Sequence, residues 1–84
     1  MLELFQYEDC PDCARVRRKL SEYRIDFVAR QVPVDASHRT RLDLATGQRD
    51  VPALVDPDQG MIVTEADDII AYLEETYGHR RANP

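Results

Sequence analysis

The two cysteines of the chain, Cys10 and Cys13, are separated by two residues and lie at a junction between two periodic patterns. An apolar, strand-like run over residues 2–7 precedes them, and a helical pattern with three- and four-residue steps follows. Pro11 suits the first position of a helix, where its missing N–H costs nothing. The spacing therefore places Cys10 at a helix N-terminus, facing solvent, where free backbone N–H groups stabilise its thiolate. Cys13, one turn further on, is then placed to attack a mixed disulfide formed at Cys10.

Two other interpretations of the cysteine pair compete with a redox site. A structural zinc site usually needs four ligands, and the sequence has neither a second C-x-x-C nor a close histidine pair, since His38 and His79 are isolated. The other alternative is a pair of inert, buried cysteines. The proline and the strand-to-helix position favour the redox interpretation over both.

Length, charge and cysteine content restrict the class of protein. A chain of 84 residues makes one small domain with a modest core. Two cysteines are too few for a secreted disulfide scaffold, and nothing resembles a signal peptide or a membrane span, so we expect a cytoplasmic protein. The formal net charge of −5 argues against nucleic-acid binding. We therefore expect neither nucleic acid nor a membrane as a partner.

The pattern along the chain predicts the element order β-α-β-α-β-β-α. Strands are expected over residues 2–7, 26–32, 51–55 and 61–63, and helices over residues 11–23, 36–46 and 64–78. Gly47 is expected to stop the second helix, and the turn formers of residues 56–60 indicate a hairpin. Thr64, with Asp67 three residues on, predicts a capping box at the start of the last helix.

This element order indicates an α/β fold with a four-stranded mixed sheet flanked by three helices on both faces. The first two strands, joined through a helix, should be parallel with a right-handed crossover, and the hairpin adds the antiparallel part. We expect a single domain over residues 1–78 and a flexible tail over residues 79–84.

Three motifs, in this order, resemble the glutaredoxin family, and the resemblance covers nearly the whole chain. They are Cys10-Pro11-Asp12-Cys13 after the first strand, Val51-Pro52 opening the third, and Thr64-Glu65-Ala66-Asp67-Asp68-Ile69 opening the last helix. The second half is also similar to the N-terminal, glutathione-binding domain of glutathione S-transferases, through V-P-A-L, a turn and T-E-A-x-x-I. The resemblance implies a thioredoxin-like (glutaredoxin) fold with Cys10 and Cys13 as the catalytic dithiol.

The resemblance also implies a glutathione site that uses Val51, Pro52, Glu65, Ala66 and Asp67. Pro52 would be cis and lie opposite the cysteines, although the residue alone fits a trans proline at the start of an edge strand equally well. Val51 would offer backbone groups to the cysteinyl part of glutathione, like an added β-strand. The N-terminus of the last helix would hold the γ-glutamyl carboxylate through backbone N–H groups. Thr64 and Asp67 also fit the simpler role of capping a helix.

The chain departs from the family pattern in charge. The family often has a lysine, an aromatic residue and a threonine where this chain has carboxylates: Glu8 and Asp9 before Cys10, Asp12 between the cysteines, and Asp50 before Val51. Nearby carboxylates disfavour a thiolate and repel anionic glutathione. Arg39 and Arg49 are candidates to offset this charge by meeting the glycyl carboxylate.

These residues predict a glutaredoxin-like thiol–disulfide oxidoreductase. Cys10 attacks a protein or glutathione mixed disulfide, and Cys13 or a second glutathione resolves it. We expect glutathione as co-substrate, disulfide-containing proteins as partners, no metal, no tightly bound cofactor, and a monomer. The alternative is a module that binds glutathione or a partner protein with little redox turnover. In a third hypothesis, two copies share an iron–sulfur cluster through Cys10 and external thiols.

Overall fold

The computed structural model describes residues 1–78, and the tail expected over residues 79–84 lies outside the described residues. The strands are β1 (Leu2–Gln6), β2 (Phe27–Gln31), β3 (Ala53–Asp56) and β4 (Met61–Thr64). The helices are α1 (Pro11–Glu22), α2 (Thr40–Thr46) and α3 (Ala66–Tyr77), with a short 3₁₀ helix at Ala36–His38. The order β-α-β-α-β-β-α is the one that the sequence predicts.

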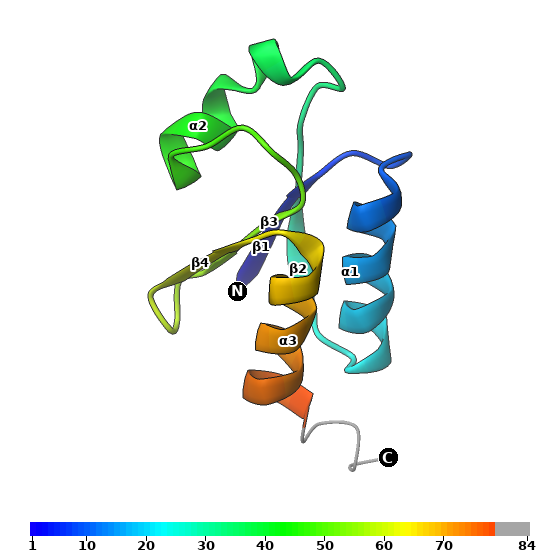
Figure 1. Cartoon of the computed structure of the whole chain (residues 1–84). Helices are drawn as coiled ribbons and strands as arrows, with labels where there is room; N and C mark the ends of the chain where they lie inside the picture. The colour runs from blue at the N-terminus through cyan, green and yellow to red at the C-terminus, as the bar shows by residue number, and fades with distance from the viewer. Residues whose placement is uncertain (79–84) are drawn as a thin grey trace.

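The strands form one mixed sheet in the order β2-β1-β3-β4. β1 and β2 are parallel, and β3 runs antiparallel to both β1 and β4. In Figure 1, α1 and α3 lie side by side over one face of the sheet, and α2 lies on the other side. The predicted fold class, a four-stranded mixed sheet with three helices in a thioredoxin-like arrangement, is confirmed.

Side chains alternate along β1 between the two layers, as successive residues of a strand must. Leu2 and Leu4 pack in the larger core, with residues of α1 and α3, whereas Phe5 packs in the smaller core with Leu42 of α2. Leu42 is fully buried, while Leu44 on the same helix is 84% exposed. A single buried residue, Leu42, therefore packs α2 into the smaller core, which explains the thin apolar stripe of this helix.

The second helix differs from the continuous helix expected over residues 36–46. It is divided at Arg39, whose φ of −89° and ψ of 52° are not helical. Arg39 is only 7% exposed, and its guanidinium bonds to backbone carbonyls of the segments that precede and follow the helix. Gly47, in the left-handed region at φ 77°, ends α2 as expected.

The start of α3 also differs from the prediction. Thr64 is the last residue of β4, where it pairs with Ala53, and Glu65 is the N-cap. Glu65 adopts a φ of 69° and no side chain caps the helix, so the predicted capping box of Thr64 and Asp67 is wrong. The carboxylate of Asp67 instead pairs with Arg15 of α1.

Within residues 1–78, each helix is too short or too polar to span a lipid bilayer.

Candidate functional site

The two cysteines lie where β1 connects to α1. Cys10 is the N-cap of α1, Pro11 is its first residue, and the Cys10 carbonyl accepts a bond of 3.0 Å from the Ala14 N–H. The backbone N–H of Cys13 donates to Sγ of Cys10 at 3.1 Å. The expected position of Cys10 at a helix N-terminus is therefore present.

The exposure of Cys10 differs from the prediction. Cys10 is only 5% exposed and Cys13 is fully buried, so the expected solvent-facing Cys10 is wrong, while the shielding of Cys13 is as expected. As an N-cap, the Cys10 sulfur turns back over the first helical turn to accept the Cys13 N–H instead of pointing outward. Burial, followed by the contact with Cys10, raises the pKa of the Cys13 thiol to about 12. Both cysteines are free thiols.

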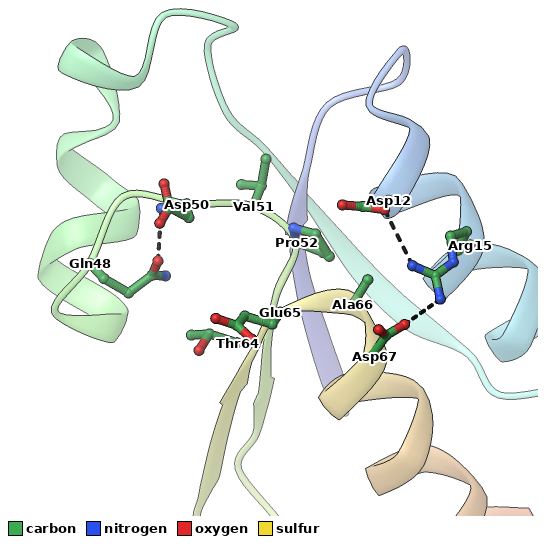
Figure 2. A pocket seen from close by; sticks show the side chains of 10 residues that line it. All are labelled: Asp12, Arg15, Gln48, Asp50, Val51, Pro52, Thr64, Glu65, Ala66 and Asp67. Carbon is green, nitrogen blue, oxygen red and sulfur yellow. Dashed lines mark hydrogen bonds and ion pairs between the residues drawn. The ribbon is translucent and has the colours of Figure 1, made fainter.

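A groove of about 340 Å³ opens beside the C-P-D-C turn, between the first turns of α1 and α3 and the loop that precedes β3 (Figure 2). All five residues that the resemblance assigned to glutathione line it: Val51, Pro52, Glu65, Ala66 and Asp67. The other lining residues are Asp12, Arg15, Gln48, Asp50 and Thr64. Asp12, between the two cysteines, connects the groove with the dithiol turn.

One wall of the groove is formed by the loop before β3. The Val51–Pro52 peptide bond is cis, the form that the resemblance implied. Strand pairing of β3 begins at Ala53 on both sides, so the backbone of Val51 lies outside the ladder. Figure 2 shows Val51 and Pro52 in the middle of the groove, between Asp50 on one side and Asp12 with Arg15 on the other.

The first turn of α3 forms another wall. The first N–H groups of a helix have no acceptor within the helix, and no side chain caps this end. Ala66 and Asp67 line the groove here, beside the N-cap Glu65. The helix end attracts anions, but Asp67 and Asp68 in the same turn oppose that attraction.

Arg15 is a lining residue that the sequence analysis did not assign to the site. Its Nη2 pairs with Oδ1 of Asp67, and its Nη1 lies 3.3 Å from Oδ1 of Asp12. The contacts with Asp67 and Asp12 raise the pKa of the guanidinium above its usual value. The pair of Arg15 with Asp12 could have been found from the sequence, because the two residues have i,i+3 spacing on one helix. The pair with Asp67 could not, because it joins residues that are 52 apart in the chain.

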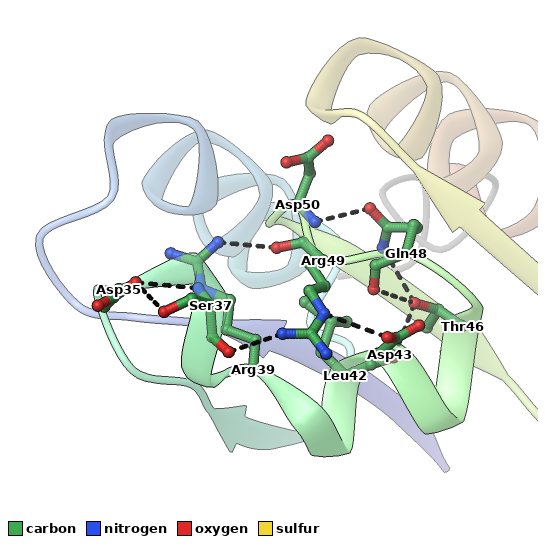
Figure 3. A network of polar contacts seen from close by, with 9 residues as sticks. All are labelled: Asp35, Ser37, Arg39, Leu42, Asp43, Thr46, Gln48, Arg49 and Asp50. Atoms are coloured by element: carbon green, nitrogen blue, oxygen red, sulfur yellow. Dashed lines mark hydrogen bonds and ion pairs between the residues drawn. The ribbon is translucent and has the colours of Figure 1, made fainter.

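The segment before Val51 is held by short polar contacts (Figure 3). Gln48, also missed by the sequence analysis, accepts the Asp50 N–H through Oε1 at 2.8 Å and donates to Oγ1 of Thr46 at 3.0 Å. The candidate roles of Arg39 and Arg49 at the groove are not supported, because neither residue lines it. Arg39 bonds to three backbone carbonyls, and Arg49 bonds to Asp43 and to the Ser37 carbonyl.

The groove is acidic overall. Its lining includes four carboxylates, those of Asp12, Asp50, Glu65 and Asp67, against the guanidinium of Arg15. No three His, Cys, Asp or Glu side chains among residues 1–78 gather in a way that could hold a metal ion.

The model of the glutathione S-transferase N-terminal domain matches residues 4–81. No curated protein matches the sequence.

Solved structures of glutathione S-transferases are similar to this chain over most of its length. A glutathione S-transferase from Rhodospirillum rubrum is 33% identical, with a TM-score of 0.77, over 93% of this chain and 34% of that one. A rice enzyme solved in complex with glutathione is 25% identical, with a TM-score of 0.78, over 93% of this chain and 34% of that one.

A diazinon-metabolizing glutathione S-transferase of the silkworm Bombyx mori is also 25% identical, with a TM-score of 0.78, over 92% of this chain and 38% of that one. The chain thus spans little more than a third of the length of these enzymes.

Proposed function

The chain belongs to the family of glutathione S-transferase N-terminal domains, and from this we propose that its groove binds glutathione beside the Cys10–Cys13 dithiol. The observation that carries the proposal is the groove itself, which gathers Val51, Pro52 and the first turn of α3 next to the C-P-D-C turn. Its volume of about 340 Å³ is in the usual range for a small-ligand site. The rice relative solved with glutathione adds support from the family.

Each wall of the groove supports contact with a different part of glutathione. The backbone of Val51, outside the β3 ladder, is available to pair with the extended cysteinyl part. The N–H groups at the start of α3 are available for the γ-glutamyl carboxylate. The two contacts would hold the tripeptide across the groove with its sulfur toward the C-P-D-C turn.

The reaction we propose for this site is thiol–disulfide exchange. The Cys10 thiolate attacks the glutathionyl sulfur of a protein–glutathione mixed disulfide, which forms a Cys10–glutathione disulfide and releases the protein thiolate, which takes up a proton. A second glutathione thiolate then attacks the glutathionyl sulfur and regenerates Cys10, leaving oxidised glutathione. The Cys13 N–H donates a hydrogen bond of 3.1 Å to the Cys10 sulfur, which places the proposed attacking atom at the N-terminus of α1.

The alternative resolving step uses Cys13 and meets an obstacle. Cys13 must lose its proton before it can attack the Cys10 sulfur, and burial raises its pKa to about 12. Resolution by a second glutathione avoids this deprotonation. The proposed protein partners are glutathionylated proteins, and size-exclusion chromatography tests the expected monomer.

A glutathione-binding module with little redox turnover is the second candidate function. The 5% exposure of Cys10 favours it, because a bulky disulfide must reach that sulfur before exchange can occur. The chain would then supply the glutathione site without the chemistry.

A single set of measurements separates the two candidates. Binding is measured by calorimetric titration with S-methylglutathione, which cannot exchange, and turnover is measured as glutathione-dependent reduction of a glutathionylated peptide. Binding with turnover supports the oxidoreductase. Binding without turnover overturns the oxidoreductase in favour of the binding module, and the absence of binding overturns both.

A further inference from the structure

The structure assigns to Arg15 a role in specificity: we infer that its guanidinium binds the α-carboxylate of the γ-glutamyl group. This inference rests on the glutathione-binding groove proposed above and adds a residue to it. Arg15 is the cation among the ten residues that line the groove, whose other charged members are carboxylates. Glutathione has two carboxylates, so an acidic groove needs a cationic contact to accept it.

Two ion pairs orient Arg15 at the groove. Asp12 holds Nη1 and Asp67 holds Nη2, so the guanidinium is fastened between the C-P-D-C turn and the first turn of α3 (Figure 2). An arginine head has five N–H donors in a planar fork, and these two contacts require only two of them. Arg15 can therefore donate hydrogen bonds to a ligand carboxylate without breaking either pair.

The position of Arg15 selects one of the two ligand carboxylates. Through its pair with Asp67, the guanidinium lies at the N-terminal end of α3, where no side chain of the N-cap residue accepts from the first backbone N–H groups. In Figure 2, Gln48 lies at the opposite end of the groove from Arg15. A tripeptide that pairs with Val51 near its middle then places its γ-glutamyl group at the Arg15 end and its glycyl group toward Gln48.

Asp67 and Asp12 act as positioning residues in this arrangement. A free arginine side chain loses considerable rotamer freedom on binding, whereas one already fastened at two points loses less. The γ-glutamyl unit is a zwitterion, and the carboxylates of Asp67 and Asp12 beside Arg15 carry the charge opposite to that of its ammonium group. The acidity of the groove is thus compatible with the ligand at this end.

The test compares two ligands on two variants. The ligands are S-methylglutathione and its analogue in which 4-aminobutyrate replaces γ-glutamate, so that only the α-carboxylate is missing. The variants are Arg15→Gln and Arg18→Gln, which remove the same charge from the same helix, and Arg18 is exposed and does not line the groove. Dissociation constants are measured by calorimetric titration at low and high salt.

We expect Arg15→Gln to weaken S-methylglutathione binding about 10-fold, the low end for a charged hydrogen bond, because the side chain is 43% exposed. The analogue should bind the wild type and Arg15→Gln equally, which also shows that the variant groove is folded. Arg18→Gln should leave both dissociation constants unchanged.

Three results would overturn the inference. They are an unchanged affinity of Arg15→Gln for S-methylglutathione, an equal loss for both ligands, and an equal loss in Arg18→Gln. If Arg15→Gln fails to fold, Arg15→Lys is compared with the wild type by the ratio of the dissociation constants of the two ligands. An equal ratio in both proteins would contradict the inference. If the wild type itself binds neither ligand, the glutathione site is wrong and the role of Arg15 falls with it.

Discussion

The backbone N–H of Cys13 donates a hydrogen bond of 3.1 Å to the Sγ atom of Cys10. This bond makes Cys10 the cap of α1 and places its sulfur over the first helical turn, with 5% of the residue exposed. The first turn of the helix thus holds one cysteine that is 5% exposed and, three residues later, one that is fully buried. The two cysteines should therefore differ in reactivity.

The first prediction concerns that difference. Cys10→Ser should abolish exchange with a glutathionylated peptide, because the sulfur at the helix end is lost. Cys13→Ser should keep most of the activity, since a second glutathione can resolve the mixed disulfide and the buried Cys13 thiol has a pKa of about 12. Peptide reduction measures both variants, and mass spectrometry after alkylation of the reduced wild type gives the order of labelling. Labelling of Cys13 before Cys10 would reverse the assignment.

Asp56 at the end of β3 is the next feature with a measurable consequence, and the sequence analysis did not single it out. It is 1% exposed, and its Oδ2 accepts bonds of 2.6 Å from the hydroxyls of Tyr72 and Tyr77 of α3. Burial acts to raise the pKa of Asp56, but hydrogen bonds from the two tyrosines and from the backbone of Gln59 and Asp58 outweigh it, and the pKa lies below its usual value. The charged carboxylate therefore connects β3 to the last helix.

The second prediction is acid sensitivity at this contact. A depressed pKa in the folded state contributes stability that is present above the unfolded value, about 3.9, and is lost as the pH falls through the folded value. Tyr72→Phe should lower the free energy of unfolding at pH 7 by about 1–3 kcal/mol and flatten its decrease in acid. Urea unfolding at a series of pH values measures both. Tyr7→Phe, which removes a hydroxyl elsewhere, is the control, and equal acid slopes in wild type and Tyr72→Phe would contradict this role.

The third prediction concerns Arg39, whose guanidinium donates bonds of 2.8–2.9 Å to the carbonyls of Pro33, Val34 and Arg49. Arg39→Gln should remove the donor of three part-buried hydrogen bonds to the backbone and lower the free energy of unfolding by roughly 2–4 kcal/mol. Arg18→Gln, an exposed change of the same charge, should shift it by less than about 0.5 kcal/mol. Denaturant unfolding compares the two variants, and similar losses in both would show that Arg39 has no structural role beyond its charge.

Local signals in the sequence predicted much of the fold. Pro11 starts α1, Gly47 ends α2, and the turn formers after β3 lead into β4, as expected. Each of these signals acts within a few residues, through a fixed φ, a left-handed φ or a short turn. The cis Val51–Pro52 bond was implied by the family resemblance and not by local pattern, since the residues alone fit a trans proline as well.

Local signals failed where a side chain had a choice of partners. Asp67 was expected to help cap its own helix, but it pairs with Arg15, and Thr64 is used by the sheet. Cys10 was expected to face solvent, but it turns back to accept an N–H. For Cys10 the position at the helix N-terminus was predicted correctly and the direction of the side chain was not, whereas for Thr64 and Asp67 the predicted capping contact is absent.

The sequence alone therefore determined the order of the elements and the helix N-terminus at Cys10, and the family resemblance pointed to five of the ten residues that line the groove. Only the tertiary structure decided which of those residues meet, because Arg15 and Asp67 are 52 residues apart and Asp56 and Tyr77 are 21 apart. Such contacts depend on how α1 and α3 pack against each other and against the sheet, and a pattern that repeats every two or four residues carries no information about that packing.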